Sequence, residues 1–407
     1  MMLPPPARKT LRETGMRGGS VRFFKREQRL RLNLALQGGG AHGAFTWGVL
    51  DRLLEDEALD IAWVSATSAG AVNAAALAAG LAEGGRERAR EKLREVWAGV
   101  VKAGVTDLMR MNPFLYSLVR SPAMSQMASL MSPYEFNPAG YDPLRRLLSE
   151  AIDFPLIRER APLEMLIAAT EVATGRTRLF RRHEMTVEAI LASACLPTLH
   201  HAVGIDGIAY WDGGFSANPD LVTLARESPV ADTLLVQLNP NFKAELPTGS
   251  REIAAHVNRL TFNAPLRRDV ELIEAVRAEA RRGDARRPWW RRKRPSELVR
   301  HRFHIIEAGR YTSGLSPDSK LKPDWGLFTY LHGAGRTETH KWLDRHRADI
   351  GKRDTADLAA RFLDPRAEAA AAAASARLVE GSGDGRDAKG AAGPLALPSP
   401  AHGSRGA

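Results

Sequence analysis

The sequence predicts an α/β protein, a three-layer α/β/α sandwich with a mostly parallel central sheet. Short and nearly continuous apolar runs, such as LNLALQ at 32–37 and TLLVQLNP at 233–240, indicate strands that are buried on both faces. Helical patterns alternate with these runs, as is typical of a parallel sheet covered by helices. The chain has 407 residues, of which 44% are hydrophobic, enough for one large domain of this kind.

The expected elements lie within a domain at 31–365. Strands are predicted at 32–37, 60–66, 163–175, 176–180, 233–240 and 303–308, and helices at 44–54, from 69 onward and at 86–103. Residues 104–140 hold five of the ten methionines, and we expect a helical cap insertion there. Methionine adapts to irregular apolar shapes, so this cap suits an apolar channel, although its methionines equally suit the core of a helical subdomain.

The excess of positive over negative charge is confined to two segments. The formal net charge is +11, while 1–32 and 281–294 each carry +7, which leaves −3 for all other residues. We therefore expect a near-neutral domain, a flexible basic arm at 1–30, a basic tryptophan loop at about 281–300 and an alanine-rich, then disordered, tail at 366–407. The distribution argues against a nucleic-acid groove within the fold and favours contact with an anionic membrane.

The basic tryptophan loop carries the predicted membrane contact. Indole rings lie at the depth of lipid headgroups, and each nearby cation gains about 1 kcal/mol from anionic lipid. The residues concerned are Arg286, Arg287, Trp289, Trp290, Arg291, Arg292, Lys293 and Arg294. Nucleic-acid binding is one alternative, because such basic runs also contact phosphates, and a solvated loop without a partner is another. The oligomeric state is not predicted.

The single cysteine, Cys195, allows no disulfide within the chain, and the amino terminus lacks the apolar core of a secretion signal. These features predict a cytoplasmic protein, at most peripheral at the inner face of a membrane.

A glycine-rich turn follows the first predicted strand. Gly38, Gly39, Gly40, Ala41, His42 and Gly43 form this loop, which directly precedes a helix. The pattern G-x-G-x-x-G in this context is one form of a nicotinamide dinucleotide site, but such a site needs an acidic residue at the end of the next strand, and Asp60 lies at its start. The other use of the loop is an oxyanion hole, because successive glycines at a helix start leave backbone N–H groups free.

Ser68 follows the second predicted strand. Small residues surround it, namely Ala66, Thr67, Ala69 and Gly70, in the manner of the G-x-S-x-G nucleophile elbow. Consecutive strands of a parallel unit are usually neighbours, so Ser68 and the glycine loop are expected at the same edge of the sheet. A plain helix N-cap is the alternative role for this serine.

Asp212 is the strongest candidate for the base that a nucleophilic serine needs. It lies between aromatic residues and a glycine pair in the run YWDGG at 210–214, whereas no histidine has a persuasive setting. An ordinary Asp-Gly hairpin turn is the alternative.

Together these motifs resemble the patatin-like phospholipase family. The order is GGGxxG, then the serine turn, then Asp-Gly-Gly, and ASACLP at 192–197 and Asn218-Pro219 extend the likeness over about 32–239. The resemblance implies a Ser68–Asp212 dyad, an oxyanion hole at 38–43, an acyl-enzyme and no metal or other cofactor. The family usually has Gly where Ala66 stands, and Arg or Lys where His42 stands.

The sequence thus predicts a serine acyl hydrolase that acts on a lipid ester. Two alternatives stay open at this point: a patatin-like lipid-binding or scaffold protein with little or no activity, and an enzyme that binds a nicotinamide dinucleotide.

Overall fold

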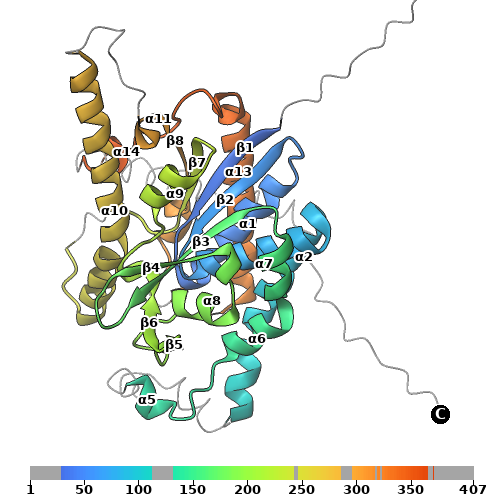
Figure 1. The fold of residues 1–407 in the computed structure, drawn as a ribbon. Helices are drawn as coiled ribbons and strands as arrows, with labels where there is room; N and C mark the ends of the chain where they lie inside the picture. The colour runs from blue at the N-terminus through green and yellow to red at the C-terminus, as the bar shows by residue number, and fades with distance from the viewer. Residues whose placement is uncertain are drawn as a thin grey trace, which may run out of the picture.

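The computed structural model describes residues 29–111, 132–242, 246–285, 296–316, 319–320, 323–364 and 370 (Figure 1). Several predictions lie outside these residues: most of the basic arm, the centre of the expected cap at 112–131, the basic tryptophan residues at 286–294 and nearly all of the tail. Within the part of the chain that is described, no helix is both long enough and apolar enough to cross a membrane.

An eight-stranded sheet forms the middle layer. Its strands are β1 (Leu30–Leu36), β2 (Leu59–Ala66), β3 (Glu164–Glu171), β4 (Thr177–Arg181), β5 (Val203–Ile205), β6 (Ile208–Asp212), β7 (Asp232–Gln237) and β8 (Arg302–Glu307). Hydrogen bonds connect them in the order β5-β6-β3-β2-β1-β7-β8, with β4 also paired to β3. Strands β3, β2, β1, β7 and β8 run parallel, as the apolar runs predicted.

Helices cover both faces of this sheet (Figure 1). The longer ones are α1 (Gly43–Leu54), α2 (Ala69–Met111), α6 (Pro143–Ala151), α7 (Phe154–Arg160), α8 (Val187–Ser193), α9 (Leu221–Glu227), α10 (Ser250–Ala285) and α13 (Trp325–His346). The shorter ones are α5 (Pro133–Phe136), α11 (Glu297–Arg300), α12 (Gly309–Thr312) and α14 (Leu358–Phe362), and single 3-10 turns include η1 (Gly40–His42) and η3 (Gly213–Phe215).

Strand β1 shows how the layers divide. Leu32, Leu34 and Leu36 point into a core shared with α1, α2 and α13. Ala35, between them, points into a second core with α9, α10 and α14. Alternate residues of a strand face opposite sides, so a strand with both sides buried is apolar throughout. The predicted three-layer α/β/α sandwich with a mostly parallel sheet is therefore confirmed.

The structure departs from the predicted elements at one end of the sheet. β4, β5 and β6 are antiparallel to their neighbours, and β5 and β6 were not predicted. Within α2, Gly84 and Gly85 leave helical geometry, which separates the two helices expected there. The described part of the expected cap at 104–140 begins as the last turns of α2 and resumes with α5.

Candidate active site

The sheet places the end of β2 opposite the end of β6. Strand β3 pairs with β4 along one edge, through Leu166 with Arg181 and Ala169 with Arg178. Its other edge pairs first with β2 and then with β6, so β2 and β6 lie in one row with their carboxyl ends facing each other.

The distance between the two strand ends follows from this register. Ala66, the last residue of β2, lies opposite Ile167, and Asp212, the last residue of β6, lies opposite Ala169. Two residues along a strand span about 7 Å. The turn that follows β2 therefore lies beside Asp212.

Ser68 occupies a strained turn between β2 and α2. Its φ is +55°, in the left-handed region that side chains rarely adopt, and its side chain is buried. The Ser193 hydroxyl accepts a hydrogen bond from the Ser68 N–H at 3.0 Å. A Cβ at Gly70 would lie 2.3 Å from the Leu36 carbonyl oxygen, so only glycine fits there. Backbone strain at a single polar residue is a frequent property of functional sites.

The glycine loop lies directly against this serine. A Cβ on Gly38 would come within 2.8 Å of the Ser68 Cβ, and one on Gly43 within 2.7 Å of the Ala69 Cβ. The first two strands are neighbours in register, so the expected meeting of the two turns is observed.

The backbone donors of this loop are fewer than the sequence predicted. The Gly38 N–H donates to the Asn218 side chain at 2.8 Å, so Gly38 is not a free donor. The N–H groups of His42 and Gly43 are used by carbonyls inside the loop. Among the described residues, no backbone or side-chain acceptor is recorded for the N–H groups of Gly39 and Gly40.

His42 is neutral in the folded protein. Burial and the nearby charge of Lys320 lower its pKa to about 4, and its Nε2 is 2.8 Å from the Ser319 hydroxyl. The Lys320 carbonyl oxygen lies 2.3 Å from where a Cβ on Gly40 would be, and Gly40 has a φ of +56°. The segment at 319–320 thus lies close against the loop.

Asp212 is completely buried and only half satisfied. Its Oδ1 accepts a hydrogen bond from the Gly214 N–H at 2.8 Å, while its Oδ2 has no partner among the described residues. Burial raises the pKa of this carboxyl to about 7, against opposing contributions from the Gly214 N–H and the Ser68 hydroxyl. An aspartate of this kind is far more basic than a free one, whose pKa is about 3.9.

Ser68 and Asp212 therefore lie next to each other in the structure. The Ser68 hydroxyl is close enough to favour the ionised form of Asp212, yet no hydrogen bond to Oδ2 is formed in this geometry. In structures without substrate, such bonds are often long and tighten only when substrate is bound.

The other candidate bases lie elsewhere. His301 contacts Thr233 at 2.7 Å and His304 contacts Asp232 at 3.3 Å, both at the amino ends of β7 and β8. His201 stacks on Tyr134, with ring centroids 4.1 Å apart. Cys195 is buried, and burial raises the pKa of its thiol to about 12.

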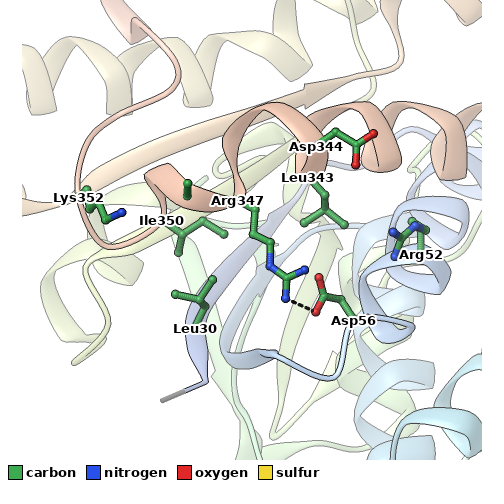
Figure 2. A pocket seen from close by; sticks show the side chains of 9 residues that line it. Leu30, Arg52, Asp56, Leu343, Asp344, Arg347, Ile350 and Lys352 are labelled. Atoms are coloured by element: carbon green, nitrogen blue, oxygen red, sulfur yellow. Dashed lines mark hydrogen bonds and ion pairs between the residues drawn. The ribbon is translucent and has the colours of Figure 1, made fainter. Parts of the chain in front are cut away.

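Two cavities differ in their relation to Asp212. The smaller, of about 150 Å³, includes Cys195, whose carbonyl accepts the Asp212 N–H at 2.8 Å. It is lined by Asn137, Gly140, Tyr141, Asp142, Leu144, Arg145, Leu191, Ala194, Cys195, His200, His201, Ala202, Val203 and Gly204. The larger, of about 470 Å³, lies at the opposite end of the sheet, where β1 begins at Leu30 and Arg347 is paired with Asp56 (Figure 2). This larger cavity is far from Ser68 and is therefore not part of the candidate active site.

Residues 34–225 match the family model described as patatin-like phospholipase. The chain contains a patatin-like phospholipase domain. It is similar to VipD from Legionella pneumophila, with 16% identity over 77% of this chain and 67% of VipD and a TM-score of 0.39. It is also similar to ExoU of Pseudomonas aeruginosa in the heterodimeric complex ExoU–SpcU, with 13% identity over 85% of this chain and 60% of that chain and a TM-score of 0.26. No curated protein sequence matches this chain.

Three contributors to the candidate site escaped sequence reasoning. Ser193 and Asn218 accept hydrogen bonds from the amides of Ser68 and Gly38, and the Lys320 carbonyl lies close to Gly40. Ser193 and Asn218 lie within the stretches that carried the family resemblance, so that resemblance was their one available signal. Lys320 had none.

Proposed function

We propose that this patatin-like protein is a serine acyl hydrolase in which Ser68 is the nucleophile and Asp212 the base. The family supports a lipid hydrolase or esterase, and the dyad is our own assignment. The observation that carries it is the buried Oδ2 of Asp212, which has no partner in the described part of the chain and lies beside a serine at positive φ. A buried polar atom without a partner is rare and costly, so it indicates a role.

The proposed reaction has two halves. Asp212 takes the proton of the Ser68 hydroxyl while Oγ bonds to the ester carbonyl carbon, and the electron pair of the C=O bond moves to its oxygen. When the C=O bond reforms, the alcohol leaves with the proton from Asp212, and the acyl group stays on Ser68. Water, deprotonated by Asp212, then attacks this acyl-enzyme by the same sequence and releases the acid.

The glycine loop supplies the stabilisation that this chemistry needs. The Gly39 and Gly40 amides are the donors we assign to the developing oxyanion, because they are free of other acceptors among the described residues and directly follow Gly38, which lies against Ser68. Removal of one such donor typically lowers the rate by roughly 10²–10³. Asn218 keeps Gly38 in place and thereby orients the two amides that follow.

Exposed apolar side chains near the start of α10 support a lipid substrate. Ile253, Val257 and Leu260 are 45%, 56% and 56% exposed, and they recur at the spacing of one helical face. In the next turn, Phe262 packs on Phe215 with ring centroids 4.9 Å apart, in the segment that follows Asp212. We infer that this face contacts the lipid surface from which the substrate enters the site.

The basic tryptophan residues at 286–294 are proposed as a second membrane contact, on the charge pattern alone. We expect binding to vesicles only when they contain anionic lipid, weakened by salt. Deletion of 286–294 should abolish that binding, and unchanged binding would remove this part of the proposal.

Ester hydrolysis by the purified protein tests the central assignment. Wild type, Ser68→Ala and Asp212→Asn are compared on acyl esters of several chain lengths, and a fluorophosphonate probe reports the reactivity of Ser68. Matched losses in hydrolysis and labelling for Ser68→Ala are expected. A folded wild type that neither hydrolyses nor reacts with the probe would favour the scaffold alternative instead.

The dinucleotide alternative finds little support in the geometry. Asp60 lies at the start of β2, where it pairs with Arg86 at 3.3 Å. Lack of any thermal shift with millimolar NAD or NADP would agree with this interpretation.

A further inference from the structure

Lys320 is a partly buried lysine that the mechanism above does not use. Its Nζ donates a hydrogen bond to the Asn239 side chain, and Asn239 in turn donates to the Gly38 carbonyl at 3.1 Å. Its own carbonyl oxygen lies over Gly40. The neighbouring Ser319 contacts His42. The segment at 319–320 therefore approaches the glycine loop at three places: at Gly38 through Asn239, at Gly40 and at His42. It does so although it is distant from the loop in the sequence.

No negative charge within the described residues accounts for this cation. Neither Lys320 nor the nearby Arg259 of α10 forms an ion pair with a carboxylate in that part of the chain. His42, which also faces Lys320, is neutral. A buried charge normally has a partner, because its desolvation is otherwise uncompensated. A cation that has no carboxylate partner among the described residues, and that lies beside the proposed oxyanion site, can pair with the charge that forms during the reaction.

We propose that Lys320 is a positioning residue that stabilises the oxyanion of acyl transfer through the glycine loop. This inference rests on the proposed function of Ser68 and the loop. The ammonium group lies two hydrogen bonds from Gly38 and polarises the loop through Asn239, so it favours the state in which negative charge is present next to Gly39 and Gly40. Lys320 brings this positive charge from a segment distant in the sequence, so the sequence of the glycine loop alone does not reveal it.

The structure also gives this role a pH signature. Burial, together with the charge of Arg259, lowers the pKa of Lys320 to about 8. Asp212 must lose its proton to act, whereas Lys320 must keep its own. Activity is therefore expected to rise as pH passes about 7 and to fall as pH passes about 8.

The test compares Lys320→Met and Lys320→Arg with the wild type on a soluble short-chain ester from pH 6 to pH 10. Lys320→Met should lower kcat about tenfold with little change in KM, since a unit charge several ångströms away in a partly buried site is worth about that factor. Its fall in activity above pH 8 should also disappear. Lys320→Arg should restore most of kcat and keep the enzyme active to pH 10, because arginine does not lose its proton.

Lys352→Met is the matched control, because this lysine lines the remote cavity of Figure 2. It should leave both kcat and the pH profile unchanged. An unaltered alkaline fall in either Lys320 variant, or a loss of kcat that arginine does not restore, would overturn the assignment. If Lys320→Met does not fold, the pH profile of Lys320→Arg decides alone. A wild type without hydrolysis or fluorophosphonate labelling would overturn the proposed function as well.

Discussion

Replacement of Asp212 by asparagine should increase the stability of the protein and strongly reduce its hydrolytic activity. The folded state raises the pKa of Asp212 from 3.8 to about 7, so it favours the protonated form. As pH rises through this interval the unfolded chain loses the proton first, and the native state becomes less stable relative to it. The penalty is complete above pH 7 and absent below about pH 4.

The size of the effect follows from the width of that interval. A difference of about three pKa units corresponds to about 4 kcal/mol, as an upper bound, at 1.36 kcal/mol for each unit. The asparagine side chain keeps an oxygen that can accept the Gly214 N–H, while its amide can donate to Ser68. The variant should therefore exceed the wild type in free energy of unfolding at pH 8, and the gain should vanish near pH 4. Its hydrolysis should fall by about 10²–10⁴.

Asp269→Asn provides the matched control. Asp269 is partly buried, and burial with the charge of Asp220 raises its pKa to about 7, but it accepts the backbone N–H of Leu221 at the start of α9 rather than facing Ser68. This variant should gain stability with the same pH dependence and keep its activity. Urea unfolding at pH 4, 6 and 8 measures the stabilities. A D212N variant that is less stable than wild type at pH 8, or a gain independent of pH, would refute the reasoning.

Three further outcomes follow from the site. Asn218→Ala leaves the buried Gly38 N–H unpaired, so unfolding should require about 1–3 kcal/mol less and labelling of Ser68 should slow; unchanged urea midpoints would contradict this. Gly40→Ala places a Cβ 2.3 Å from the Lys320 carbonyl at a φ of +56°, so the loop must shift and labelling of Ser68 should drop at least tenfold. Gly204→Ala is the control: nothing lies within 4 Å of the added Cβ, so this variant should label normally. Leu260→Glu should reduce hydrolysis of lipid in vesicles severalfold and leave a soluble short-chain ester unaffected, and equal losses on both substrates would argue against lipid contact by α10.

The sequence was informative where the signal is local. The apolar runs around Leu34 and Leu234, with glycine or serine turns after strands, predicted the central strands and the meeting of Ser68 with the glycine loop. Close contacts explain why the residues there must be small, as at Gly70.

The remainder depends on contacts between distant segments. β5 and β6 have only three and five residues, and Ile208 is 43% exposed, so the sequence offers too short a pattern to identify them as strands. Family resemblance, rather than spacing, connected Asp212 with Ser68. The contact of Lys320 with Gly40 joins segments nearly at opposite ends of the fold, and nothing in the local sequence around a lysine records such a neighbour. The raised pKa of Asp212 similarly arises from burial, which only the folded structure defines.

The shared edge of β3 has a consequence for how this domain tolerates change. β2 and β6 are both hydrogen-bonded to that edge, so the spacing of Ser68 and Asp212 is fixed within the sheet and not by the connecting chain. The connections that leave and re-enter the sheet between them can therefore gain or lose residues and leave the chemistry intact. One residue added to β3 between Ile167 and Ala169 would instead turn the following side chains to the opposite face and separate the pair.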